Sequence, residues 1–249
     1  MLSLIILIIL INKKSKYIYE NFDNQQDLKN ICIYVINLKK DIESLKNFKK
    51  SITKNNLEFN RFDAIDAKKI PDDDLRLKIF DNVKKVKFNK AQKCCYLSHL
   101  NTLKKLKKKK KNLNLIFEDD VIIPIDFIKK LQNYVTQLPD NWDILFLGGN
   151  KIIGRKHSKN IIEPEFTTKG NYGAFAYLIK GSSIDKIIDI CSNVEYHYDI
   201  QLQNGINQGL NLFFTYPHLI KHNYNYFSNN FNKKRNHESK KRNKITILN

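Results

Sequence analysis

Apolar runs and helical repeats alternate along the chain from about residue 30 onward. Residues 31–38, ICIYVINL, form a continuous apolar and β-branched run, which is typical of a strand buried on both faces. Residues 41–52 follow with apolar side chains at helical spacing and with Asp41 as the predicted N-cap. Residues 59–65 then form a second short strand. This strand, helix and strand order predicts an α/β fold.

The same patterns continue through the rest of the chain. The predicted helices begin near Pro71 and cover residues 94–106, 125–138 and 181–192, the last with a serine cap. The predicted strands cover residues 113–123, 142–149 and 172–180, and residues 149–171 are predicted to be a polar loop.

The two ends of the chain differ from this pattern. Residues 1–11, MLSLIILIILI, are shorter than the roughly 20 apolar residues that span a membrane, and they lack the features of a cleaved signal. They form either a membrane-associated segment or a buried strand or short helix. We therefore divide the chain into an apolar segment and linker (1–29), a folded domain (30–227) and a basic, disordered tail (228–249). Membrane-associated and cytoplasmic locations both stay open.

The charge balance narrows the choice of partners. The chain has 44 Lys and Arg against 25 Asp and Glu, a formal net charge of +19. Lys far outnumbers Arg, however, and the basic runs are nearly pure Lys without the interleaved Arg and aromatic residues of nucleic-acid readers. We therefore predict no specific nucleic-acid partner. The four cysteines show neither zinc-site spacing nor a disulfide framework.

One acidic triplet interrupts an apolar strand. Glu118, Asp119 and Asp120 lie within LNLIFEDDVIIP, with apolar residues on both sides. A strand that ends in acids at the edge of an α/β sheet places them in the crevice where such sheets bind ligands. Alternation along an extended chain points Glu118 and Asp120 to one side and Asp119 to the other. Glu118 and Asp120 are thus predicted to share Mg²⁺ or Mn²⁺, and the alternative is a solvated turn with helix-capping acids.

Several short stretches then stand in a recognisable order. They are IYVINL (33–38), FDAIDA (62–67), CYLSH (95–99), LIFEDDV (115–121), WDILFLG (142–148), GAFAYLI (173–179) and YDIQL (198–202). Together they resemble the motifs of glycosyltransferase family 25, which contains the lipooligosaccharide galactosyltransferases and the collagen β-galactosyltransferases. The likeness covers about residues 31–217.

This resemblance implies a GT-A fold, an α/β nucleotide-sugar-binding sandwich with a central, mostly parallel sheet. It also implies a nucleotide-sugar donor, expected to be a UDP-sugar, a divalent metal such as Mn²⁺ or Mg²⁺, and transfer with inversion to a hydroxyl of a glycan or protein. The donor-binding residues it implies are Asn37 and Leu38 at the end of the first strand, Ser98 and His99 at the opening of the helix before the acidic strand, and Asp119.

Inversion requires a general base near the acceptor hydroxyl, and Asp199 is the candidate. The alternative role of Asp199 is a helix cap, in which case Asp119 or Glu195 is next in line. The third metal ligand is predicted to come from the late segment TYPHLIKHNYNYF, through His218 or His222, and we select His222.

Two other function classes stay open. The first is a metal-dependent phosphoesterase, although a haloacid-dehalogenase site needs Asp-x-Asp-x-Thr after an early strand, and the first strand here ends INLKKD. The second is a non-catalytic or degenerate GT-A-like module. Product analysis with nucleotide sugars against phosphate esters separates a phosphoesterase from a glycosyltransferase.

Overall fold

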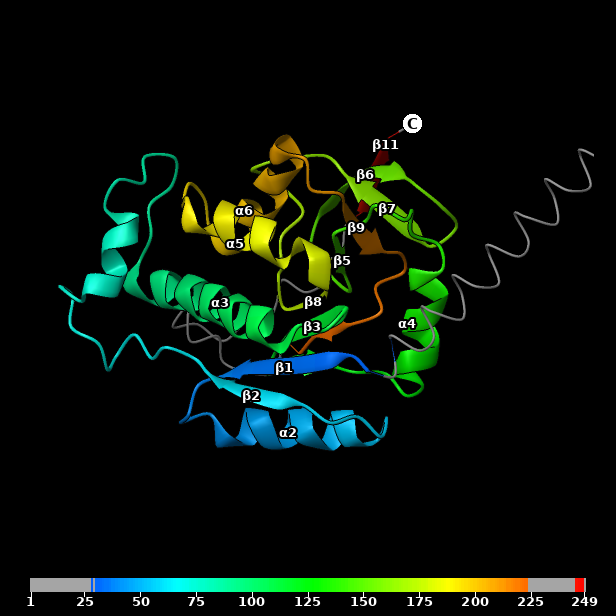
Figure 1. The fold of residues 1–249 in the computed structure, drawn as a ribbon, viewed down its shortest axis with the longest axis horizontal. Helices are drawn as coiled ribbons and strands as arrows, with labels where there is room; N and C mark the ends of the chain where they lie inside the picture. The colour runs from blue at the N-terminus through cyan, green and yellow to red at the C-terminus, as the bar shows by residue number, and fades with distance from the viewer. Residues whose placement is uncertain (1–27, 29, 224–244, 249) are drawn as a thin grey trace, which may run out of the picture.

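A computed structural model describes residues 28, 30–223 and 245–248 of the chain (Figure 1). Within these residues, nine strands form one sheet. In sheet order they are β11 (Ile245–Leu248), β6 (Ile152–Lys156), β7 (Ile161–Pro164), β9 (Leu212–Thr215), β5 (Ile144–Phe146), β8 (Ala176–Lys180), β3 (Leu113–Glu118), β1 (Cys32–Asn37) and β2 (Asn60–Asp63). A separate ribbon pairs β4 (Val121–Ile122) with β10 (Lys221–His222).

The large sheet is mixed. Strand β1 pairs parallel with both β2 and β3, as the strand, helix and strand order predicted. Strand β8 runs antiparallel between β3 and β5, and β5 in turn pairs parallel with β9. The predicted α/β class with a central sheet is confirmed.

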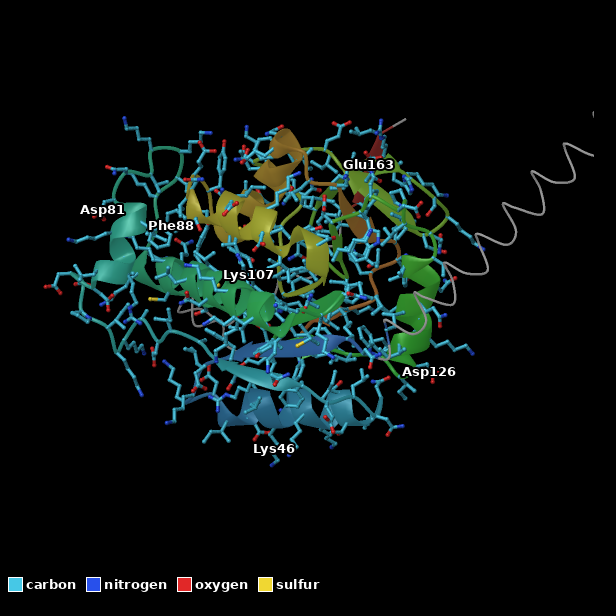
Figure 2. The ribbon with its side chains drawn as sticks, viewed as in Figure 1. Lys46, Asp81, Phe88, Lys107, Asp126 and Glu163 are labelled. Carbon is cyan, nitrogen blue, oxygen red and sulfur yellow. The ribbon has the colours of Figure 1, made fainter. Side chains whose placement is uncertain are left out.

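Helices cover both faces of this sheet. They are α2 (Ile42–Thr53), α3 (Lys90–Lys109), α4 (Phe127–Val135), α5 (Ile184–Ser192) and α6 (Tyr198–Asn204), with short 3₁₀ helices at Leu75–Phe80, Gly181–Ser183 and Gly205–Gln208. Figure 1 shows α2 on one side of β1 and β2, and α3 on the other. Lys46 extends from α2 away from the sheet (Figure 2).

Two apolar cores therefore share the strands. On β1, Val35 packs in the core formed with α2 and α4, whereas Ile36 packs in the core formed with α3, α5 and α6. On β3, Phe117 and Ile116 divide in the same way. Because neighbouring strand residues point to opposite faces, a strand buried on both sides needs a continuous apolar run, and this explains the sequence of residues 31–38.

The predicted polar loop at residues 149–171 is wrong in part, because it contains the antiparallel strands β6 and β7. These strands lie towards the edge of the sheet, where one face can carry polar side chains. Arg155, for example, is exposed and forms an ion pair of 2.9 Å with Glu163 on the partner strand. An apolar pattern strong enough to identify them is therefore missing.

Several predicted helix starts differ in detail. The helix predicted near Pro71 is a 3₁₀ helix that begins at Leu75, with Asp74 as its cap. Ser183 precedes α5 but makes no capping hydrogen bond, because its hydroxyl bonds to the carboxylate of Asp143 instead. Asp41 occupies the N-cap position of α2, also without a side-chain capping bond.

Parts of the predicted linker and of the predicted tail pack against the folded domain. Residues 245–248, within the predicted disordered tail, form β11 and pair parallel with β6; the remainder of that tail lies outside the described residues. Leu28, within the predicted linker, is buried against the core beneath α2 and α4. Residues 1–11 lie outside the described part of the chain, and none of the described helices is long and apolar enough to span a membrane.

The burial of Leu28 generates a stability prediction. Its side chain is 1% exposed, so Leu28→Ala removes buried methyl groups and leaves a cavity. We expect a loss of about 2–5 kcal/mol in the free energy of unfolding, measured by denaturant titration. Leu75→Ala is the matched control, because Leu75 is 73% exposed and its truncation should change stability by less than about 0.5 kcal/mol. Equal losses in the two variants would contradict a core position for Leu28.

Candidate functional site

The acidic triplet lies at the carboxyl end of β3. Glu118 is the last residue of that strand, and its backbone N–H donates to the carbonyl of Phe175 at 2.8 Å. The parallel register places Glu118 beside Ile36, so Asn37 at the end of β1 lies next to the acids. The acids and Asn37 thus lie at the carboxyl ends of two adjacent parallel strands, the edge at which α/β sheets bind ligands.

The ribbon of β4 and β10 brings a histidine from late in the chain to this edge. Its register pairs His222 with Val121, and the N–H of Asn223 donates to the carbonyl of Asp120 at 2.7 Å. The Nε2 atom of His222 then lies 3.0 Å from Oδ2 of Asp120. The imidazole also packs edge-on against Phe175, with ring centroids 5.3 Å apart.

Glu118, Asp120 and His222 form a ligand set suited to a divalent cation. Each offers one ligand atom, and these atoms lie within 4.8 Å of one another. In the described part of the chain, Oδ1 of Asp120 is buried without a hydrogen-bond partner, which is costly for a carboxylate oxygen unless a cation meets it. Two carboxylates with one imidazole suit Mn²⁺, so the residues fit the metal that the resemblance implied.

Asp119 turns away from this cluster, as the alternation predicted. Its Oδ2 atom accepts a short hydrogen bond from Nδ2 of Asn37, which also donates to the carbonyl of Asp41 at 3.0 Å. Burial raises the pKa of Asp119 to about 7; the hydrogen bond from Asn37 lowers it, and the charges of Asp120 and Glu118 raise it further. Asn37 itself is 2% exposed, so it mainly orients Asp119.

Ser98 and His99 do not open a helix, contrary to the prediction. Helix α3 begins at Lys90, because Asn89 and Gln92 form a capping box two turns before Ser98. The hydroxyl of Ser98 is buried; it donates to the carbonyl of Cys94 at 2.7 Å and accepts from the N–H of Ile65 at 2.9 Å. Ser98 therefore joins α3 to the segment after β2.

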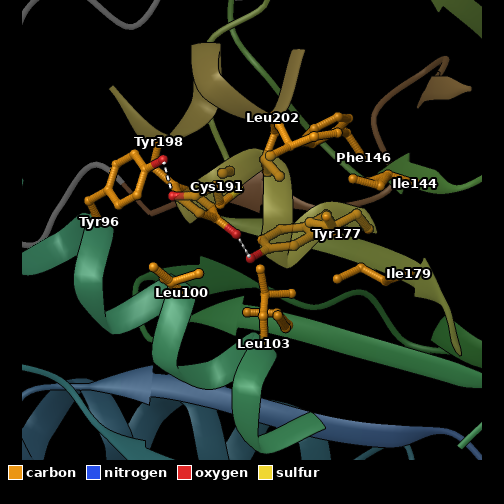
Figure 3. Close-up of a cluster of buried hydrophobic side chains, with 14 of the residues drawn as sticks. Tyr96, Leu100, Leu103, Ile144, Phe146, Tyr177, Ile179, Cys191, Tyr198 and Leu202 are labelled. Atoms are coloured by element: carbon orange, nitrogen blue, oxygen red, sulfur yellow. Dashed lines mark hydrogen bonds between the residues drawn. The ribbon is translucent and has the colours of Figure 1, made fainter. Parts of the chain in front are cut away.

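His99 lies behind Glu118 and begins a line of buried polar contacts. Its Nε2 is 3.2 Å from Oε1 of Glu118, and its Nδ1 is 3.0 Å from the hydroxyl of Tyr177. The Tyr177 hydroxyl in turn lies 2.9 Å from that of Tyr198 (Figure 3). The His99 ring also stacks on Tyr198, with centroids 4.3 Å apart. His99 is 1% exposed, so its polar atoms are engaged inside the protein.

Sequence reasoning missed the two tyrosines. Tyr177 lies in the apolar strand GAFAYLI and Tyr198 beside apolar residues of α6, and such contexts usually indicate core packing. Their hydroxyls matter only because α3, β8 and α6 meet at one point. The one available signal was that a buried tyrosine hydroxyl normally needs a hydrogen-bond partner.

Asp199 lies in the first turn of α6, whose N-cap is His197. Its Oδ2 accepts from the N–H of Gly173 at 3.1 Å, and its Oδ1 accepts from the N–H of Ile200 at 2.9 Å. The second contact is to the next residue along the first turn, while the N-cap position predicted as the alternative role of Asp199 is occupied by His197. Burial raises the pKa of Asp199, the two N–H donors lower it, and the charge of Glu118 raises it. Asp199 is therefore held in one orientation by backbone N–H groups from the segment before β8 and from α6.

The remaining candidate residues lie outside the cluster of metal ligands. Leu38 follows β1 and is half-buried, and its carbonyl accepts from the N–H of Asp41 at 2.9 Å. His218 lies near Thr215, with Nδ1 3.1 Å from that carbonyl, and it belongs to neither ligand cluster found among the described residues. Glu195 forms an exposed ion pair of 3.0 Å with a lysine.

Comparison with known proteins identifies the family of this chain. The sequence model of glycosyltransferase family 25, described as an LPS biosynthesis protein family, matches residues 30–202. The chain therefore belongs to glycosyltransferase family 25. The matched region contains the acidic triplet, His99 and Asp199, but it ends before His222.

Individual relatives are distant. Procollagen galactosyltransferase 1-A of Xenopus laevis is 22% identical over 176 residues, a match that covers 63% of this chain and 28% of that protein. Among solved structures, the inositol-1-phosphate CTP transferase from T. maritima is 13% identical with a TM-score of 0.41, covering 74% of this chain and 84% of that one. A glycosyltransferase involved in glycosylation of the major capsid of PBCV-1 is 9% identical with a TM-score of 0.38, covering 65% of each chain.

The raised pKa of Asp119 generates a prediction about stability. Since its pKa in the folded protein is about 7 against an ordinary value of 3.8, the folded state favours the protonated carboxyl. The stability that the folded state gains from this protonated carboxyl is fully present below the ordinary pKa. It is lost as pH rises through about 7. In metal-free protein, Asp119→Asn should therefore melt higher than wild type at about pH 8, and the difference should shrink towards about pH 5.

The matched control is Asp73→Asn, because Asp73 is an exposed carboxylate. Its melting temperature should follow that of wild type across the same pH range. A difference between Asp119→Asn and wild type that does not change with pH would show that Asp119 does not titrate in this window.

Proposed function

We propose that the chain transfers a sugar, galactose by analogy with its named relative, from a nucleotide-sugar donor to a hydroxyl of a glycan or a hydroxylated protein. The donor is a UDP-sugar, the reaction uses Mn²⁺ or Mg²⁺, and the anomeric centre is inverted. Family membership supports the reaction class and the nucleotide-sugar donor. The procollagen galactosyltransferase match supports galactose and a protein acceptor, and lipooligosaccharide is the alternative acceptor.

The observation that carries the proposal is the convergence of Glu118, Asp120 and His222 at the carboxyl ends of the strands. A bound divalent cation supplies positive charge against the developing negative charge of a diphosphate leaving group. The protein fixes the geometry of the ligands in advance. His222 lies against Asp120, and His99 lies against Glu118, so neither carboxylate rotates freely.

The ends of β1 and β3 form the donor side of the proposed site. Asn37 holds Asp119 in place, and Leu38 offers a half-buried apolar surface beside it. A cation bound by the neighbouring acids favours the carboxylate form of Asp119, which accepts a hydrogen bond from a sugar hydroxyl. We assign the nucleoside and its ribose to this side of the crevice.

Asp199 is assigned as the base on the acceptor side. Burial makes its carboxylate a stronger base than an exposed aspartate, while two backbone N–H groups hold it in one orientation. Each of its oxygens keeps lone-pair capacity for an acceptor hydroxyl. The carboxylate takes the hydroxyl proton as the oxygen attacks the anomeric carbon from the face opposite the leaving diphosphate, which inverts that centre.

Asp120→Asn tests the metal site. The amide keeps the size of the side chain but loses the charge and one oxygen, so metal-dependent turnover of the donor should fall by at least about 10- to 100-fold. Hydrolysis of UDP-galactose at increasing Mn²⁺ concentrations measures this effect. Asp73→Asn should behave as wild type. Unchanged turnover with an unchanged metal requirement in Asp120→Asn would remove the proposed metal site.

Asp199→Asn tests the base. Transfer to the acceptor should fall by about 10²- to 10⁴-fold, while the affinities for Mn²⁺ and for nucleotide stay close to wild type. Glu195→Gln is the comparison variant, because Glu195 forms a surface ion pair and should transfer at nearly the wild-type rate. If Asp199→Asn changes only the melting temperature, the residue stabilises the first turn of α6 and the base lies elsewhere.

A further inference from the structure

A second group of potential metal ligands lies on the other side of Glu118. Cys95 and His99 are four residues apart on α3, so they share one face of that helix. Together with Glu118, each offers one ligand atom, and the three atoms lie within 4.8 Å of one another. Cys95 is partly exposed and the Glu118 side chain is 31% exposed, so a small ion can reach the group from solvent.

One distance within this group, between His99 and Glu118, matches the separation of two coordinated ligands. Zinc binds histidine nitrogen and carboxylate oxygen at about 2.0–2.2 Å, so two such ligands in a tetrahedron lie about 3.3 Å apart. The measured distance between Nε2 of His99 and Oε1 of Glu118 is 3.2 Å. This edge of a zinc tetrahedron therefore requires almost no movement of either side chain.

The surroundings of His99 are also those of a metal ligand. A coordinating histidine almost always uses its second ring nitrogen in a hydrogen bond that fixes the ring. Here Nδ1 lies 3.0 Å from the buried hydroxyl of Tyr177, which contacts Tyr198 in turn (Figure 3). With Nδ1 engaged in this way and the ring stacked on Tyr198, Nε2 is held pointing at Glu118.

We propose that Cys95, His99 and Glu118 form a second cation site, selective for a thiophilic ion such as Zn²⁺, that shares Glu118 with the cluster of Asp120 and His222. A cysteine sulfur favours Zn²⁺, whereas the carboxylate-rich cluster favours Mn²⁺ or Mg²⁺. Because one carboxylate belongs to both groups, an ion bound by Cys95 and His99 draws Glu118 away from the other cluster. Zn²⁺ therefore inhibits the Mn²⁺-dependent reaction; only this last step rests on the function proposed above.

Cobalt spectroscopy tests the site without any enzyme assay. The full chain, cleared of metal with a chelator, is titrated with Co²⁺, which replaces Zn²⁺ in sites of this kind. Wild type should show the near-ultraviolet absorption of sulfur-to-cobalt charge transfer, saturating at one equivalent, and Zn²⁺ should displace it. Cys95→Ser should lose this absorption. Cys94→Ser should keep it, because the neighbouring Cys94 side chain is buried in the core.

Melting temperatures of the two serine variants confirm that each is folded before the titration is interpreted. Should Cys94→Ser fail to fold, Cys32→Ser serves as the control, since Cys32 lies on β1 and belongs to neither ligand cluster. Absence of the absorption in wild type overturns the proposal, and so does its persistence in Cys95→Ser.

Inhibition provides the second arm. With Mn²⁺-supported hydrolysis of UDP-galactose as the readout, the Zn²⁺ concentration for half inhibition should rise by about tenfold or more in Cys95→Ser. Equal inhibition of Cys95→Ser and wild type would overturn the shared-carboxylate explanation. If wild type shows the cobalt absorption but no metal-dependent turnover of any nucleotide sugar, the proposed function fails while the cation site stands.

Discussion

Three adjacent carboxylates repel one another, and the arrangement of the site follows from how the fold separates them. Each acid faces a different partner: Glu118 faces His99 on α3, Asp119 faces Asn37 at the end of β1, and Asp120 faces His222 on β10. Three elements from distant parts of the chain must therefore meet at the end of β3. The burial of these acids is tolerable only because each has a polar neighbour of its own, and a cation further reduces their repulsion.

The features predicted from the sequence were those set by short-range periodicity. The apolar run of residues 31–38 identified a strand buried on both faces, and alternation placed Glu118 and Asp120 on one side. The contact of His222 with Asp120 depends instead on the register of β4 and β10, which no local pattern encodes. His222 could be selected as a candidate only by its residue type, and its neighbour His218 was an equal candidate until the register was known.

The elements that were predicted wrongly share one physical cause. In each of them the apolar repeat along the sequence does not coincide with the bounds of the strand or helix. Strands β6 and β7 carry polar side chains because they lie towards a sheet edge, so they resembled a loop. The start of α3 was misplaced because Asn89 caps it before the apolar repeat begins, which moved His99 from the helix end into its middle. That shift changes the role expected of His99, from contact with the nucleotide-sugar donor to contact with Glu118 inside the protein.

The division of β1 between two cores constrains how the site can change during evolution. Val35 and Ile36 point to opposite faces, and Asn37 follows directly beside Asp119. An insertion or deletion of one residue within β1 would send every following side chain to the wrong core and carry Asn37 away from the acids. Any shift that displaces Asn37 thus also disrupts the apolar cores and destabilises the fold. Changes of specificity should therefore accumulate in the loops after the strands and not within them.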